Sequence, residues 1–324
     1  MTERRRDPTT GEWVIFATAR QHRTFLPPAD LCPLCPTLDP ARQTEIPRPS
    51  YDIVVFDNRW PALSGHPPEP DLVGDDLYLT EPAAGAAEVV VFTSDHGATL
   101  ADLPVERIAH LIDVWAHRYA ELGARPEVGY VFAFENKGEA VGVTLHHPHG
   151  QVYGYPEVPP RVATELRCAQ AHLAQHGTCV WCDVVAAEEA STTRLVVQGD
   201  AFSAYVPFAA RYPYEVHLSS RRHVGSLLDL DPAARTDLAR VLRQVLQAYD
   251  RLHGFPLPYV LSVHQRPTDG GDWDAVSHVH LELTPLHRTA TKLKYLAGSE
   301  TGAGAYVADV RPEEAAARLR GLLP

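Results

Sequence analysis

The 324-residue chain has no run of apolar residues that approaches the ~20 needed to span a bilayer. Its first residues, Met-Thr-Glu-Arg-Arg-Arg-Asp, lead into no apolar stretch of the kind found in secretory signals. No segment is of low complexity. These absences exclude a membrane-spanning or secreted class, and we expect a globular, cytoplasmic protein without membrane contact.

The chain also lacks an excess of positive charge. Its formal net charge is −12 with histidines counted neutral, whereas nucleic-acid binders present a basic face. The composition therefore excludes nucleic acid as a partner. It does not exclude a phosphorylated small molecule, because an anion site is local and needs only a few arginines.

Cysteine is scarce, and its spacing is informative. Four of the five cysteines form two Cys-x-x-Cys pairs, Cys32 with Cys35 and Cys179 with Cys182. In a reducing cytoplasm this pattern favours metal binding over disulfides.

The sequence contains an internal repeat. The second cysteine pair follows the first by about 150 residues, and four landmarks recur in one order in each half: the pair, a histidine at a strand end, a long amphipathic helix, and a His-x-His strand. The segments EVVVFTSDHGATLADL (88–103) and EVHLSSRRHVGSLLDL (215–230) are similar. The repeat predicts two tandem halves, residues 1–157 and 158–324, joined near the prolines of 156–160.

Each half is expected to contain short strands and one long helix. Strands that follow one another closely favour antiparallel pairing, so the predicted fold class is α+β. The two helices are expected around residues 108–119 and 238–249, where apolar residues recur at helical spacing. We expect each half to be a mostly antiparallel sheet with a long helix, the two forming one continuous unit.

Two metal sites follow from the repeat. Each cysteine pair needs two further ligands to close a tetrahedral zinc site, and the strand-end histidine and the first His of His-x-His supply them. A site with four protein ligands has no open position, so both zinc ions are expected to be structural. The predicted sets are Cys32, Cys35, His96 and His147, and Cys179, Cys182, His223 and His278.

The string His147-Pro148-His149-Gly150-Gln151 carries the candidate chemistry. Pro148 fixes the backbone, and His147 as a metal ligand anchors the turn, which leaves His149 free. A neutral imidazole is a competent nucleophile near pH 7. An isolated His-x-His is most often an ordinary turn, but the surrounding motifs favour a catalytic His149 assisted by Gln151.

Several strings together resemble the galactose-1-phosphate uridylyltransferase family of the histidine-triad superfamily. The resemblance covers nearly the whole chain. The strings are Arg-Asp-Pro-x-Thr-Gly-x-Trp from Arg6, the Cys32/Cys35 pair, Phe56-Asp57-Asn58, and Glu135-Asn136-Lys137-Gly138 running into the His147–Gln151 block.

The resemblance implies transfer of UMP from UDP-glucose to galactose 1-phosphate through a uridylyl-His149 intermediate. It also implies two structural zinc ions per chain and a homodimer, in which a C-terminal segment closes over nucleotide and sugar and can come from the partner. The substrate-binding residues implied are Arg20, Arg23, Asn58, Arg59, Trp60, Asn136, Gly142, Thr144, Gln151, Lys294, Tyr295 and Glu300.

The chain departs from the family pattern at three points. Arg59 stands where an acidic residue is common, and Tyr306, beside the glycine-rich 302–304, stands where a sugar-contacting Gln is expected. Some members instead build the second metal site from a Glu and three His; the matching residues here are Glu165, His264, His278 and His280. The second cysteine pair favours the thiolate-containing set, because zinc prefers thiolate to carboxylate.

Two alternatives remain at the level of sequence. One is a sister nucleotide-sugar phosphorylase that uses ADP-glucose and inorganic phosphate; it would share His149 and both metal sites. The other is a zinc-stabilised nucleotide-binding module without turnover, against which the intact Gly150 and Gln151 argue.

Overall fold

A single nine-stranded antiparallel sheet runs through both halves of the chain, in the order β3-β5-β7-β6-β11-β12-β10-β9-β8. The structure is a computed structural model and describes residues 2–324. Its N-terminal half contains β1 (Thr2–Arg6), β2 (Trp13–Ala17), β3 (Val54–Asp57), β4 (Thr80–Pro82), β5 (Ala86–Val91), α1 (Val105–Gly123), β6 (Tyr130–Lys137) and β7 (His149–Tyr155).

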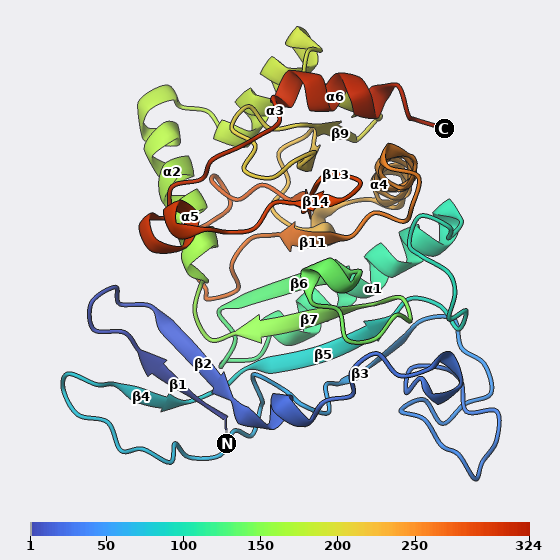
Figure 1. Cartoon of the computed structure of the whole chain (residues 1–324). Coiled ribbons are helices and arrows are strands. Elements are labelled where there is room, and N and C mark those ends of the chain that lie inside the picture. Colours follow the sequence, from blue (N-terminus) through green and yellow to red (C-terminus); the bar gives the residue numbers. More distant parts are fainter. Residues whose placement is uncertain (1) are drawn as a thin grey trace.

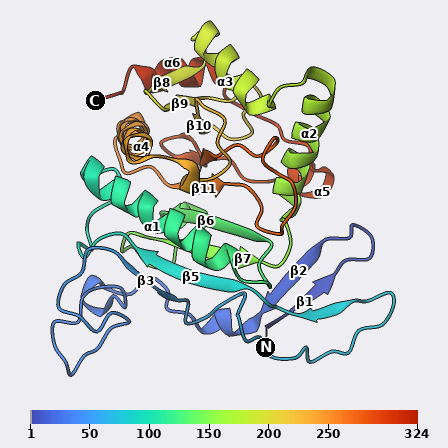
Figure 2. The same cartoon turned by 180° about the vertical axis from the view of Figure 1, so that it is seen from behind.

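The second half begins with two helices and ends with a helical tail (Figures 1 and 2). Its elements are α2 (Pro160–His176), α3 (Val180–Ser191), β8 (Leu195–Gln198), β9 (Phe202–Tyr205), β10 (Val216–Ser220), α4 (Pro232–Leu252), β11 (Tyr259–His264), β12 (His280–Pro285), β13 (His287–Thr289), β14 (Lys292–Leu293), α5 (Gly298–Ala303) and α6 (Pro312–Arg320). Short 3-10 helices lie at Thr18–His22, Ala29–Leu31, Glu139–Val141 and Leu227–Asp229.

The two halves meet where β6 pairs with β11, from Tyr259 opposite Lys137 to Val263 opposite Ala133. This pairing makes one sheet out of two, as expected for a continuous unit. The fold is α+β with two tandem halves, so the predicted class is confirmed. The division after residue 157 stays a prediction.

The long helices α1 and α4 pack on each other and on one face of the sheet (Figure 2). Both are amphipathic, with buried residues at helical spacing that include Trp115 in α1 and Tyr249 in α4. These helices seal that face of the sheet with apolar side chains. The other face is therefore where β7 can present polar side chains.

The strand register corrects one detail of the repeat. In the first half Val89 pairs with Gln151, and in the second His217 pairs with Glu282. Gln151 and Glu282 are equivalent, because each follows the second His of His-x-His by two residues. Their partners Val89 and His217 are therefore equivalent too, whereas Glu88 and Glu215 are not. A one-residue slip moves a side chain to the opposite face, so the two similar glutamates have different environments.

The remaining N-terminal strands form a separate three-stranded sheet, β2-β1-β4, which projects from the body of the molecule (Figure 1). In residues 2–324 no helix is both long and apolar enough to cross a membrane.

Candidate functional site

The principal candidate site is a cavity of about 330 Å³ on the face of β7 that α1 does not cover. Alternation along the strand points His149 and Gln151 into the cavity, whereas Val152 is fully buried in the core with α1. The predicted residues that line the cavity are Arg20, Arg23, Asn58, Arg59, Trp60, Thr144, His149 and Gln151.

His149 is held in one tautomer by a backbone contact. Its Nδ1 lies 2.7 Å from the carbonyl oxygen of His147, which can only accept a hydrogen bond. Nδ1 therefore carries the proton, and Nε2 keeps its lone pair. Burial lowers the pKa of His149, although the bond to the His147 carbonyl opposes this, so the ring is neutral near pH 7.

Gln151 is also oriented by a neighbour. Asn58 Nδ2 donates to Gln151 Oε1 at 3.1 Å, and Asn58 Oδ1 accepts from the backbone N–H of Trp60 at 2.9 Å. With its oxygen engaged, Gln151 presents its NH₂ group to the cavity. An amide donor beside a nucleophile suits a phosphate oxygen that gains charge during attack.

A smaller cavity of about 100 Å³ adjoins the first and places the predicted phosphate-binding groups around His149. Arg20, from the 3-10 helix Thr18–His22, donates from Nη1 to the hydroxyl of Tyr153 at 3.0 Å. Gly142 has φ +83°, a conformation that favours glycine. The predicted residues that line this cavity are Arg20, Arg23, Asn136, Gly142, Thr144, His149 and Gln151.

Arg59 lies at the rim of the main cavity. Its guanidinium pairs with Glu45 at 3.0 Å and lies over the ring of Trp60, 5.5 Å from the ring centroid. Its side chain is largely exposed. Arg59 is therefore placed to meet the outer part of a ligand rather than the atoms beside His149.

The C-terminal segment is not brought to His149 within one chain. Lys294, Tyr295 and Glu300 line none of the cavities around His149, and α5 lies well apart from β3 and β5 (Figure 1). Lys294 Nζ donates to Glu300 Oε1 at 2.8 Å, both side chains being buried, whereas Tyr295 is exposed. The predicted closure by these residues does not occur in cis.

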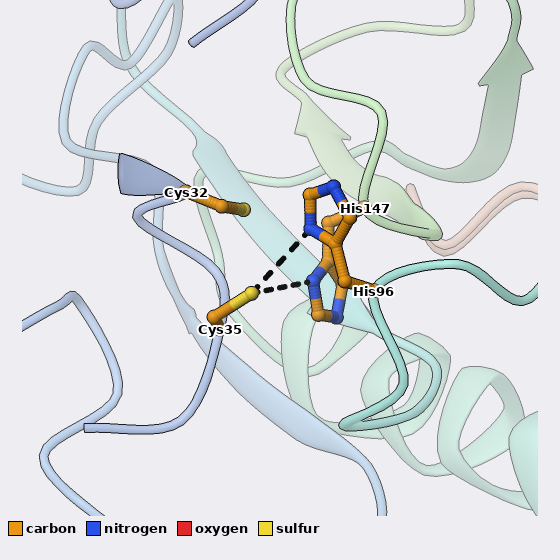
Figure 3. Close-up of side chains that lie close together, drawn as sticks. All are labelled: Cys32, Cys35, His96 and His147. Atoms are coloured by element: carbon orange, nitrogen blue, oxygen red, sulfur yellow. Dashed lines mark hydrogen bonds between the residues drawn. The ribbon is translucent and has the colours of Figure 1, made fainter. Parts of the chain in front are cut away.

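The first cysteine pair and its predicted histidines converge beside β7 (Figure 3). Cys35 Sγ lies 3.4 Å from His96 Nδ1 and 3.5 Å from His147 Nδ1, and Cys32 is buried with them. Nε2 of His147 donates to the carbonyl oxygen of Thr93 at 2.8 Å. This outer contact turns the unprotonated Nδ1 toward the sulfur atoms, as in metal-bound histidines.

The donor set fits zinc. Two thiols and two imidazoles provide four soft or borderline ligands in a partly buried site. Burial, with a further contribution from Cys32, raises the pKa of Cys35 to about 12. A divalent cation offsets such a shift, since it deprotonates a coordinating thiol. This group could hold a zinc ion that fixes His147, two residues from His149.

The second cysteine pair gathers its predicted histidines in the same way. His278 Nδ1 lies 3.7 Å from both Cys179 Sγ and Cys182 Sγ, and His223 Nδ1 lies 3.8 Å from Cys182 Sγ. Nε2 of His278 donates to the carbonyl oxygen of Ser220 at 2.8 Å. The two clusters therefore share one plan, and both could hold zinc.

The alternative set that contains a carboxylate assembles with one different member. His278 lies with the cysteines, while Glu165, His264 and His280 gather with Glu282 instead. His264 Nδ1 lies 2.9 Å from Glu165 Oε2, and although burial raises the pKa of Glu165, His264 lowers it to about 2. His278 precedes β12 and lies with the cysteines, its Nε2 bonded to the Ser220 carbonyl. Glu282 takes its place beside Glu165.

Two residues of the site were missed from the sequence. Tyr153, which holds Arg20, follows His149 and Gln151 at period two on β7, so strand alternation alone would have predicted its face. The hydroxyl oxygen of Tyr51 lies 2.9 Å from His147 Nε2, and the hydroxyl donates to the Leu34 carbonyl oxygen at 2.6 Å. No sequence pattern links Tyr51 to the metal cluster, since 96 residues separate it from His147.

His149 and Gln151, from a His-x-His-x-Gln string that leads into β7, face a cavity lined by arginines and amides, on a frame repeated in two halves. This combination defines a two-part nucleotidyltransferase of the histidine-triad type. Comparison with known families makes the assignment specific. Residues 1–159 match the N-terminal domain of galactose-1-phosphate uridyl transferase, and residues 165–324 match its C-terminal domain. The chain belongs to the galactose-1-phosphate uridylyltransferase family, and it is a transferase.

Curated relatives of that name span the whole chain. The Thermotoga maritima protein is 38% identical over 320 residues, covering 99% of this chain and 98% of its own length. The Streptomyces lividans protein is 40% identical over 328 residues, covering 98% and 86%. A solved uridylyltransferase structure superposes with a TM-score of 0.87 at 36% identity, covering 99% of this chain and 98% of that one.

A second solved structure bears on the choice of substrate. An ADP-glucose phosphorylase from Arabidopsis thaliana with bound ADP-glucose has a TM-score of 0.74 and 26% identity, with 99% of both chains covered. The uridylyltransferase is thus more similar than the phosphorylase in both sequence and structure.

Proposed function

We propose that this protein transfers UMP from UDP-glucose to galactose 1-phosphate, with His149 as the covalent carrier. The observation that carries the proposal is the tautomer of His149, whose Nδ1 is committed to the His147 carbonyl and whose Nε2 faces the cavity. Gln151, Arg20 and Thr144 line the same cavity and offer groups that bind phosphate.

The reaction takes two displacements. In the first, the lone pair of His149 Nε2 forms a bond to the α-phosphorus of UDP-glucose, and glucose 1-phosphate leaves with the electrons of the bridging P–O bond. In the second, a phosphate oxygen of galactose 1-phosphate attacks the same phosphorus, the P–N bond breaks, and UDP-galactose leaves. Covalent catalysis divides one transfer into two easier steps.

The surrounding groups stabilise charge rather than move protons. The incoming phosphate is already an anion, so no strong general base is required. Phosphorylation of Nε2 makes the ring cationic, and the His147 carbonyl oxygen, 2.7 Å from Nδ1, stabilises that cation. Gln151 donates to a non-bridging oxygen, while Arg20, Arg23 and Asn136 hold the phosphates by positioning and electrostatics.

Zinc at the two Cys₂His₂ groups would supply folding energy and fixed orientation, since neither set leaves a position open for substrate. Cys32, Cys35, His96 and His147 would hold the first ion, and through the backbone at 147–149 that ion would orient the nucleophile. Cys179, Cys182, His223 and His278 would hold the second.

The active unit we propose is a homodimer. Lys294, Tyr295 and Glu300 match the family segment that contacts nucleotide and sugar, yet they line none of the cavities around His149 in their own chain. The helix α5 lies apart from β3 and β5 (Figure 1). Supply of this segment by the partner subunit accounts for its position and completes the sugar side of the cavity.

The test is a side-by-side measurement of kcat/KM. We expect UDP-glucose with galactose 1-phosphate to exceed ADP-glucose with inorganic phosphate by a wide margin. Arg59 and Tyr306 predict that selectivity for galactose over other hexose 1-phosphates is relaxed. A higher kcat/KM for ADP-glucose with phosphate would replace this assignment with that of a phosphorylase.

A further inference from the structure

A second cavity, of about 730 Å³, opens in the C-terminal half between α3 and the segment that follows β9. Four aromatic side chains line it: Trp181, Tyr205, Phe208 and Tyr306. Phe208 is 76% exposed, and the guanidinium of Arg194 lies over its ring, 5.1 Å from the centroid. None of these residues lines a cavity around His149 in the same chain.

Strand register shows that this cavity occupies the place of the first one in the repeat. Phe56 pairs with Val89, and Tyr205 pairs with His217. Because Val89 and His217 are matched positions, Phe56 and Tyr205 are equivalent as well. Leu34 and Trp181 are equivalent because each is the third residue of a Cys-x-x-Cys pair. Wall residues of both cavities therefore stand at matched positions: Leu34 with Trp181, Phe56 with Tyr205, and Val89 with His217.

The catalytic groups have not been kept at the matched positions. His280 corresponds to His149, but the ring of Trp181 stacks on it with centroids 3.9 Å apart, and His280 is buried. Glu282 takes the place of Gln151 and would repel a phosphate that gains charge in a transfer. The second cavity is thus suited to binding without group transfer.

Two polar groups in the cavity are free to meet a ligand. Glu188 is 3% exposed, its Oε1 accepts from Arg194 at 2.7 Å, and its Oε2 has no hydrogen-bond partner among the described residues. A buried oxygen without a partner is costly, and a ligand N–H would satisfy it. The guanidinium of Arg211 lies over the ring of Tyr306, 5.6 Å from its centroid. Its ion pairs are long, 3.8 Å to Glu215 and 3.6 Å to Glu282, so its N–H groups can bind an anion.

The acidic groups near Arg211 do not exclude an anion. His217 Nε2 lies 3.0 Å from Glu215 and 3.3 Å from Glu282, and Arg161 lies 3.2 Å from Glu282. Glu215 and Glu282 each have a cationic partner that lies closer than Arg211 does. The positive charge of Arg211 is therefore available to a ligand.

We propose that this second cavity binds a nucleoside monophosphate. The base stacks between Trp181 and Phe208, with a ring or amino N–H donated to Glu188 Oε2, and the phosphate binds Arg211. Aromatic stacking supplies affinity for any base, and the arginine adds affinity for the phosphate. The inference rests on the proposed function only in taking the matched first cavity as a nucleotide site.

The test is a count of UMP bound per chain by equilibrium dialysis of the zinc-loaded protein. We expect two UMP per chain in the wild type and one in Phe208→Ala, which removes an exposed ring and should fold. Tyr78→Ala, which removes a 58% exposed ring that lines neither cavity, is the matched control and should keep two. Uridine should bind the second site about tenfold more weakly than UMP, because the bond between phosphate and Arg211 is lost.

One UMP per chain in the wild type would overturn the proposal, as would a second site unaffected by Phe208→Ala or one that binds uridine as tightly as UMP. Failure here is distinct from failure of the proposed function. A protein that transfers UMP at full rate yet binds one nucleotide loses only the second site, whereas one that binds two but transfers none loses only the reaction.

Discussion

The residue on which the chemistry depends is His149, and its reactivity follows from a single backbone contact. The bond from Nδ1 to the His147 carbonyl leaves Nε2 as the nucleophilic atom, and the burial that lowers the pKa of His149 keeps the ring neutral. Pro148 contributes rigidity to the turn, so the carbonyl and the ring that it orients lie in a fixed relation.

Replacement of His149 should abolish transfer without unfolding the protein. We expect His149→Ala to lose on the order of 10⁴-fold or more in kcat, because no other group can carry the uridylyl group. The melting temperature and zinc content should stay at wild-type values, since His149 is not a metal ligand. Steady-state kinetics check this, with His176→Ala, an exposed histidine, as the control. A His149→Ala protein with near wild-type kcat would rule out the assigned role.

Tyr153 should act through Arg20. In Tyr153→Phe the ring remains but the acceptor for Arg20 Nη1 is lost, so Arg20 is no longer fixed beside the phosphates. We expect kcat/KM for UDP-glucose to fall about tenfold, as for loss of one hydrogen bond to a charged group. The neighbouring change Tyr155→Phe is the control. Equal kinetics for the two variants would show that Tyr153 serves packing alone.

At the scale of elements, the two cysteine clusters have one design but unequal consequences. The first leads through residues 147–149 to His149, which faces the cavity. The second leads through residues 278–280 to His280, whose ring is stacked against Trp181. Loss of a ligand should therefore affect activity differently in the two halves.

We expect Cys32→Ser to reduce kcat more than Cys179→Ser, because only the first zinc orients the nucleophile. Contacts that orient a metal ligand cost roughly 10- to 100-fold in activity when they are lost. Elemental analysis should give about two zinc ions per wild-type chain and about one in each variant, by the ligand count. Larger damage from Cys179→Ser, or one zinc with one iron in the wild type, would contradict this arrangement.

The junction of β6 and β11 contains a buried carboxyl that makes stability depend on pH. Burial raises the pKa of Glu135 from 4.5 to about 7, although the Tyr259 hydroxyl, donating at 2.9 Å, and Lys137 oppose the shift. The folded state thus binds a proton that the unfolded state has lost between pH 4.5 and 7. This contribution to stability is full below about pH 4.5 and is lost as the pH rises through about 7.

Glu135→Gln should remove that dependence. We expect the variant to gain stability relative to the wild type as the pH rises from 5 to 8, because an amide carries no charge to bury. Urea unfolding at the two pH values measures the difference, and Glu121→Gln, a change on the exposed side of α1, controls for net charge. If the gap between variant and wild type stayed constant with pH, Glu135 would not be the titrating group.

Strands and helices were largely predictable because their periodicities are local. The helix pattern at 108–119 lies within α1, and that at 238–249 lies within α4. Equivalence between strands was harder to predict. The similar strings beginning at Glu88 and Glu215 suggest one alignment, but hydrogen-bond pairing shifts it by one residue and reverses the face. Similarity between two sequence segments does not specify strand register, because long-range pairing determines it.

At the scale of the whole molecule, the position of the C-terminal segment was the feature least accessible from sequence. Motif matching identified Lys294, Tyr295 and Glu300, but their place depends on how the tail packs after β14. The structure holds Lys294 and Glu300 in a buried pair that lines none of the cavities around His149. The cluster of Glu282 with Glu165 is likewise a product of tertiary packing across more than 100 residues.

If the partner subunit completes each site, two inactive chains should complement each other. One chain carries His149→Ala, and the other carries Lys294→Met with Glu300→Gln, changed together so that no unpaired charge is buried. A 1:1 mixture that exchanges subunits should recover about a quarter of wild-type activity, because half the dimers are hybrid and each hybrid has one intact site. Recovery of no activity by a mixture shown to contain hybrid dimers would argue for a site built within one chain.

The most direct measurement is intact-protein mass spectrometry after the chain is mixed with UDP-glucose alone. We expect one added uridylyl group per chain, located on the peptide that contains His149, and its complete loss when galactose 1-phosphate is added. His149→Ala should show no adduct under the same conditions. A wild-type chain that turns over yet never gains the uridylyl group, or an adduct on another residue, would contradict covalent transfer through His149.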